Sequence, residues 1–82
     1  MDHQSVYTEA SEYDAIIQNF VQELRDGASQ ELIALGVSAR DAAGIVAVQT
    51  PVSSEILGRT PSAIRGRAKT VAKRLTARLD SF

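Results

Sequence analysis

The chain has 82 residues, of which 44% are hydrophobic and 23% charged, and its formal net charge is −1. This length corresponds to one domain, and the absence of cysteine excludes a disulfide framework and a thiolate metal site. Because prolines and aromatic residues are few and alanine is abundant, we expect an all-α fold, a small bundle of about five helices.

Residues 1–8 have no clear periodicity, so we expect a flexible N-terminal arm, followed by a single helical domain over residues 9–82. The N-terminus lacks the order of basic and then apolar residues that a signal peptide has. The longest apolar run, residues 42–48, is too short to span a bilayer. We therefore expect a cytoplasmic protein without a membrane partner.

The first helix is predicted over about residues 11–26. Ser11 and Asp14 have the spacing of a capping box, and Gly27 is expected to end the helix. Apolar residues recur at steps of three and four and share one face: Tyr13, Ile16, Ile17, Phe20, Val21 and Leu24. This pattern is typical of an amphipathic helix.

Three shorter helices are predicted next, over about residues 30–35, 39–49 and 51–57. Ser29 is the expected N-cap of the first, and Gly36 ends it. Ser38 and Asp41 repeat the capping-box spacing at the start of the second. Pro51 begins the third, because proline at a first helical position gives up only an N–H group that has no partner there.

The longest helix is predicted over about residues 61–80, after the start signal of Thr60 and Pro61. Its apolar stripe consists of Ile64, Ala68, Val71, Leu75, Leu79 and Phe82. One row of bases lies away from this stripe and consists of Arg65, Lys69 and Lys73. A second row flanks the opposite border of the stripe and consists of Arg67, Arg74 and Arg78.

Charge is strongly segregated along the chain. Residues 1–58 hold nine acids against two bases, a net charge of −7, whereas residues 59–82 hold seven bases against one acid, a net charge of +6. Such polarity is typical of a protein with a polyanionic partner, or of two oppositely charged parts that pair with each other. In the second case, acids of the first helix such as Glu23 and Asp26 would neutralise the basic helix.

Residues 51–64 have the pattern of a helix-turn-helix unit, which we expect over about residues 50–80. A short helix, a turn at Gly58 and a capped helix follow one another. Ser54 supplies the small residue before the glycine, and Ile64 supplies the packing residue after it. A turn this short predicts a steep crossing of the two helices, and in this geometry the second helix lies in the major groove of DNA.

Residues 58–68 (Gly-Arg-Thr-Pro-Ser-Ala-Ile-Arg-Gly-Arg-Ala) resemble the start of the last helix in Myb/SANT-type and related bacterial helix-turn-helix domains. The resemblance is limited to about residues 50–77. It implies a base-reading face made of Ser62, Arg65, Gly66 and Lys69, with Arg59 at the turn that faces the phosphates.

The candidate DNA-binding residues are Arg59, Thr60, Ser62, Arg65, Gly66, Lys69 and Lys73. Arg65 has the fork geometry that pairs with guanine, whereas Lys69 and Lys73 supply charge that releases counterions from DNA. We therefore expect a sequence-specific DNA-binding transcriptional regulator that uses the helix starting at Pro61 as its recognition helix. Because one short helix gives little affinity, double-stranded DNA is expected to bind a homodimer.

The sequence predicts no enzyme, no cofactor, no metal site and no small-molecule substrate. His3 is the only histidine, and a single imidazole cannot assemble a metal site or a nucleophile relay. No glycine loop that would bind a phosphate occurs, and the carboxylates of Asp14, Glu23 and Asp26 are spaced for a solvated helix face.

The alternative is a helical protein-interaction module, an antitoxin-like or anti-activator dimer with no DNA contact of its own. Its basis is the spacing of the apolar stripe in residues 64–82, which is close to that of a coiled-coil seam. In this arrangement the acidic first helix of one copy packs along the basic last helix of its partner.

Overall fold

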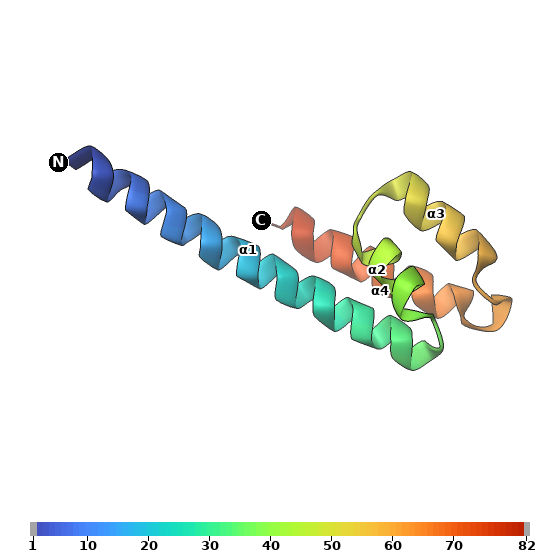
Figure 1. Cartoon of the computed structure of the whole chain (residues 1–82). Helices are drawn as coiled ribbons and strands as arrows, with labels where there is room; N and C mark the ends of the chain where they lie inside the picture. Colours follow the sequence, from blue (N-terminus) through green and yellow to red (C-terminus); the bar gives the residue numbers. More distant parts are fainter. Residues whose placement is uncertain (1, 82) are drawn as a thin grey trace.

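The computed structural model describes the backbone of residues 2–81 and the side chains of residues 12–81. Residues 2–81 form four helices and no strand (Figure 1): α1 (Asp2–Leu35), α2 (Ala39–Val46), α3 (Thr50–Arg59) and α4 (Ser62–Asp80). The predicted all-α fold is confirmed, with fewer helices than expected. Within the described part of the chain, no helix has the length and apolar content needed to cross a membrane.

α1 is a single helix of 34 residues that replaces two predicted helices, 11–26 and 30–35. Residues 2–8, expected to be an arm, also belong to it. The prediction that Gly27 ends the first helix is therefore wrong. Ala28 and Leu32 are buried and continue the apolar face beyond this glycine, and their packing outweighs the intrinsic cost of a helical glycine, about 1 kcal/mol.

The end of α1 and the start of α2 match their sequence signals. Gly36 has a φ of 110°, the left-handed conformation that glycine adopts without strain. The N–H of Val37 donates to the carbonyl oxygen of Leu32 at 3.0 Å, which gives α1 a Schellman ending. The hydroxyl of Ser38 then caps α2 by accepting a hydrogen bond from the N–H of Asp41 at 3.2 Å.

The corner between α3 and α4 differs from the prediction. Gly58 lies in the last turn of α3, so Thr60 and Pro61 connect the helices in place of a glycine turn. Beyond this connection α4 runs back past α3 (Figure 1). A hollow of about 410 Å³ separates the two helices, with Leu57 of α3 on one wall and Ala72 of α4 on the other.

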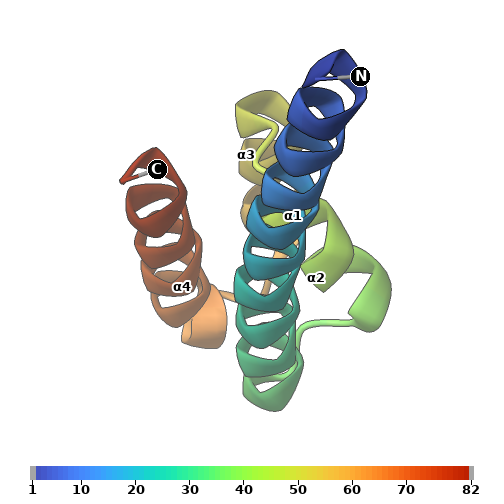
Figure 2. The same ribbon diagram turned by 90° about the vertical axis from the view of Figure 1, so that its left-hand side faces the viewer.

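The core lies between the C-terminal half of α1 and the other three helices. Figure 2 looks from the N-terminal end of α1 and shows α4 and α2 on different sides of it. The buried apolar residues are Ala28, Leu32, Val37, Ala42, Ile45, Val46, Ile56, Leu57, Ala68, Val71 and Leu75. The predicted stripe of α4 therefore faces the core, with Ile64 and Leu79 packed at its ends. Phe82, also expected on this stripe, lies outside the described residues.

The N-terminal half of α1 projects beyond the bundle (Figure 1), and the long axis of the molecule measures 59 Å against 22 and 20 Å for the others. The residues of α1 that join the core all come from its C-terminal half: Leu24, Ala28, Leu32 and Leu35. Tyr13 and Ile16, on the projecting half, are each 66% exposed. The apolar face predicted for the first helix thus continues past the core into solvent.

Candidate nucleic-acid interface

Thr60 stabilises the C-terminus of α3. It is only 4% exposed, and its Oγ1 donates a hydrogen bond to the carbonyl oxygen of Ile56 at 2.8 Å. Its backbone N–H donates to the carbonyl oxygen of Leu57 at 3.3 Å. The structure therefore places this predicted DNA-binding residue inside the corner, where its hydroxyl satisfies a carbonyl oxygen of the helix end.

Arg65 folds back from α4 onto the end of α3. Its Nε and Nη2 donate to the carbonyl oxygen of Thr60 at 3.1 and 2.8 Å, and its Nη2 also donates to that of Gly58 at 3.2 Å. These carbonyl oxygens belong to the negative end of the helix dipole, so the guanidinium caps α3. Arg65 is half-buried in this position, and its Nε and Nη2 are already hydrogen-bonded within the corner between α3 and α4.

Arg59 pairs with the start of α2. Its Nη2 lies 2.7 Å from Oδ1 of Asp41, the carboxylate in the first turn of that helix. The hydrogen bond with Arg59 lowers the pKa of Asp41, and the same contact raises the pKa of Arg59. The phosphate-facing residue implied by the resemblance is thus engaged in an ion pair within the chain.

The remaining candidates share the outer face of α4, opposite the core stripe. This outer face consists of the exposed residues Ser62, Gly66, Lys69, Thr70 and Lys73. A Cβ added at Gly66 would meet nothing within 4 Å, and the hydroxyl of Thr70 donates to the carbonyl oxygen of Gly66 at 3.0 Å. No acid occurs in α4 before Asp80. The structure therefore brings together four of the seven candidates, Ser62, Gly66, Lys69 and Lys73, on one positive face.

The N-terminus of α4 lies at one end of this outer face. Pro61 precedes the helix without a side-chain capping bond. The N–H groups of Ile64 and Arg65 donate to the carbonyl oxygen of Pro61, both at 3.0 Å, whereas no acceptor within the described residues bonds the N–H of Ser62. Free N–H groups and the positive end of the helix dipole favour an anion at this position.

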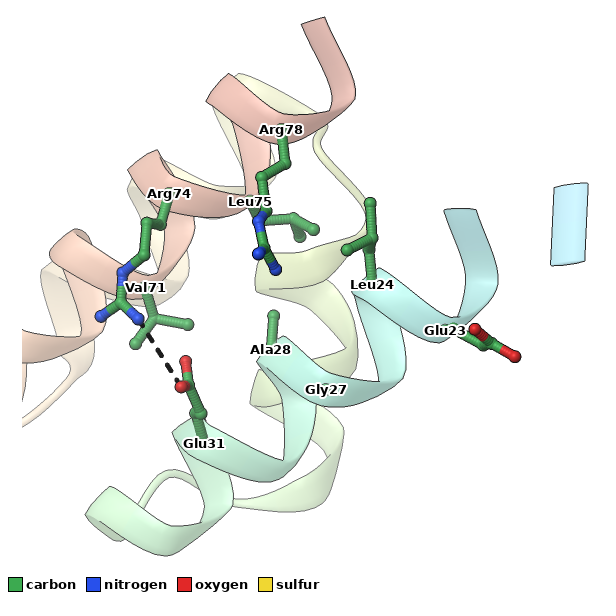
Figure 3. A pocket seen from close by; sticks show the side chains of 9 residues that line it. All are labelled: Glu23, Leu24, Gly27, Ala28, Glu31, Val71, Arg74, Leu75 and Arg78. Atoms are coloured by element: carbon green, nitrogen blue, oxygen red, sulfur yellow. Dashed lines mark ion pairs between the residues drawn. The ribbon is translucent and has the colours of Figure 1, made fainter. Parts of the chain in front are cut away.

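Two bases of the second row, Arg74 and Arg78, face α1 (Figure 3). Nη1 of Arg74 lies 3.6 Å from Oε1 of Glu31, and both side chains are exposed. Arg78 points into the hollow between the helices, whose volume is about 190 Å³, whereas Glu23 points away from α4. The carboxylate of Asp26 instead accepts a hydrogen bond from Gln22. Neutralisation of α4 by the first helix is therefore limited, within residues 12–81, to the pair of Arg74 and Glu31.

Three roles that the sequence did not predict lie at the C-terminal end of α3: the hydrogen bonds of Thr60, the cap formed by Arg65 and the ion pair of Arg59. An arginine that follows a helix end by one turn can reach the last carbonyl oxygens of that helix, and the spacing of Arg65 from Thr60 was the available signal.

No group of three or more metal-ligating side chains occurs among the described residues. Comparisons with protein-family models, with curated proteins and with solved structures found no match to this chain.

Proposed function

We propose that the protein is a DNA-binding regulator that contacts the duplex with the outer face of α4. The observation that carries the proposal is the acid-free row of small and basic residues on this face: Ser62, Gly66, Lys69, Thr70 and Lys73. Small side chains let a helix backbone approach the floor of a groove, and the lysines reach the phosphates.

The hydrogen bonds of Arg65 change how such a contact would read sequence. The sequence predicted that Arg65 forms two hydrogen bonds with a guanine base. Because its guanidinium caps α3, we do not propose that contact. Ser62 and Thr70 are then the hydroxyl groups nearest to base edges, and Lys69 and Lys73 contribute charge. We therefore expect binding dominated by phosphate contacts, with modest sequence preference.

The test is a titration of labelled mixed-sequence duplexes by fluorescence anisotropy at low and moderate salt. Reversal of both lysines, Lys69→Glu with Lys73→Glu, should weaken binding at least about tenfold and lower the salt slope by about 0.9 for each lost phosphate contact. Arg40→Glu, an exposed base of α2, is the control and should have a smaller effect. Absence of binding at micromolar protein and low salt would contradict the proposal, as would equal losses in the two variants.

A second candidate is a helical protein-interaction module without DNA contact. It is favoured by one observation, the exposure of Tyr13 and Ile16 on the projecting half of α1, which a DNA contact through α4 does not use. Charge reversal of Lys69 and Lys73 separates the candidates, because the module should keep its assembly state and all of its partners after that change.

A further inference from the structure

α1 extends beyond the helix that covers it. α4 packs along the C-terminal half of α1 and ends there, whereas the projecting half of α1 continues past it (Figure 1, Figure 2). Glu31 and Leu35 of α1 lie beside α4, since both line a hollow shared with that helix. Tyr13 and Ile17 precede them by 18 residues, which is five whole turns at about 3.6 residues per turn. The side of α1 that receives α4 therefore continues along the projecting half.

This side of the projecting half is apolar and largely exposed. Tyr13 and Ile16 are each 66% exposed and Phe20 is 49% exposed, whereas Ile17 is half-buried. These four residues, which we call the apolar strip, have the spacing i, i+3, i+4 and i+7 that places side chains on one side of a helix. Because an amphipathic helix binds through side chains with this same spacing, the strip fits the apolar side of one further helix.

Both borders of the apolar strip are acidic. Residues 12–24 carry three acids and no base. Glu12 lies about one turn before Ile16 and Glu23 about two turns after it, so both lie on the border beside Ile16, whereas Asp14 lies on the opposite border. All three carboxylates are exposed. A partner that meets these borders with lysine or arginine is therefore favoured over a neutral or an acidic one.

Two bases lie near the strip, and neither neutralises its borders. Arg78 of α4 lines a hollow of about 490 Å³ at the inner end of the strip, together with Phe20 and Leu24. Arg25 lies about a third of a turn around α1 from Tyr13. In the part of the chain with described side chains, neither base forms an ion pair with an acid of the strip. The borders of the strip therefore remain negative.

We propose that the apolar strip binds an amphipathic helix of a different protein, with lysine or arginine along both borders of its apolar side. The partner helix continues the line of α4 along α1. A second copy of this chain does not meet that description. Its basic helix, α4, already has its apolar stripe of Ala68, Val71 and Leu75 buried, and two projecting halves placed together would oppose their acidic borders.

The partner helix and the proposed DNA contact use different surfaces. The strip lies on α1, whereas Lys69 and Lys73 lie on the outer face of α4. The inference therefore does not rest on DNA binding. A bound helix also stabilises the projecting half, because a helix in a protein gains most of its stability from the packing of its apolar face.

Isothermal titration calorimetry of the full chain with synthetic peptides tests the proposal. The probe is a peptide of about 18 residues, five helical turns, with leucine at steps of three and four residues and lysine elsewhere. A second peptide has glutamate in place of each lysine, and a third has the residues of the probe in shuffled order. The probe should bind with micromolar affinity, and the other two at least about tenfold more weakly. Absence of probe binding, or equal binding of the shuffled peptide, would overturn the proposal.

Two matched substitutions locate the bound probe. Tyr13→Glu adds a charge that attracts the basic peptide but removes an apolar contact, so affinity should fall at least about tenfold. Ala15→Glu adds the same charge at an exposed position on the opposite side of α1 and should leave affinity within about twofold. Because Tyr13 is outside the core, circular dichroism should show a folded bundle in both variants. Equal affinities of the two variants would refute binding at the strip.

Removal of the border acids tests the charge of the partner. Glu12→Gln with Glu23→Gln should weaken binding of the probe about threefold or more. Asp26→Asn with Glu55→Gln removes two exposed carboxylates elsewhere, and an equal loss in this control would contradict the acidic borders. Sedimentation velocity of the chain alone tests the other occupant. A dimer that Tyr13→Glu dissolves would assign the strip to a second copy and would overturn the proposal.

Discussion

Arg65 donates two hydrogen bonds to the carbonyl oxygen of Thr60, from Nε at 3.1 Å and from Nη2 at 2.8 Å. This contact joins the first turns of α4 to the end of α3 across the corner. Beyond the corner a hollow of about 410 Å³ lies between the two helices, with Leu57 of α3 and Ala72 of α4 among its lining residues. The contact fixes how the end of α3 meets the first turns of α4, whereas the buried stripe of α4 packs against α1.

Loss of the Arg65 guanidinium should destabilise the protein. Arg65→Ala leaves carbonyl oxygens of α3 without their charged donor, and we expect a loss of about 1–3 kcal/mol in the free energy of unfolding. Lys69→Ala, at an exposed base of the same helix, should change it by less than about 0.5 kcal/mol. Urea denaturation measures both values, and equal losses would contradict the capping role.

The buried hydroxyl of Thr60 should also contribute to the free energy of unfolding. Thr60→Val keeps the shape of the side chain but removes its hydrogen bond to the carbonyl oxygen of Ile56, at an expected cost of about 1 kcal/mol. DNA affinity should stay within about twofold of the wild type, because the side chain does not reach solvent. A tenfold loss of DNA affinity in a folded Thr60→Val protein would show that this residue does contribute to the DNA-binding surface.

α2 and α3 approach each other closely at Gly44. A Cβ added there would collide with the terminal methyl group of the buried Ile56. We expect the overpacking, about 1–3 kcal/mol, to outweigh the gain of about 1 kcal/mol that alanine has over glycine in a helix, so Gly44→Ala should destabilise the protein. Gly66→Ala is the matched control, since nothing lies within 4 Å of its added methyl group and alanine favours the helix. Thermal unfolding should show opposite shifts, and a stabilised Gly44→Ala variant would contradict this packing.

The ion pair of Asp41 and Arg59 should stabilise the fold to an extent that depends on pH. The folded-state pKa of Asp41 is lowered from its ordinary value of 3.8, mainly by the hydrogen bond from Arg59. The contribution is therefore present above about pH 4, the unfolded-state pKa, and is lost as the pH falls through the lower folded-state value. Asp41→Asn should remove this part of the acid dependence, whereas Asp14→Asn, at an exposed position of α1, should keep it. Unchanged acid unfolding of Asp41→Asn would count against the pair.

Local sequence patterns predicted those helix ends at which the capping group and the backbone group that it bonds are close in sequence. The cap of Ser38 and the left-handed Gly36 were found because each involves backbone groups within five residues. The apolar stripe of α4 was also predicted, since its period directly reports the buried face. The positions of Lys69 and Lys73 on the outer face follow from the same period.

Contacts between distant residues account for what the sequence did not predict. Gly27 looked like a helix end, but burial of Ala28 and Leu32 against other helices keeps α1 continuous. Arg59 looked free for DNA, and its partner Asp41 lies 18 positions away in the chain. The hollow between α1 and α4 requires the two helices to lie side by side, which no local pattern of either helix specifies.

The most direct test of the proposed DNA contact is backbone amide NMR with increasing amounts of a mixed-sequence duplex at low salt. The proposal predicts shift changes at Ser62, Gly66, Lys69, Thr70 and Lys73, with little change in the projecting half of α1. Amide shifts that remain constant throughout the titration, or that change only around Tyr13 and Ile16, would contradict binding through the outer face of α4.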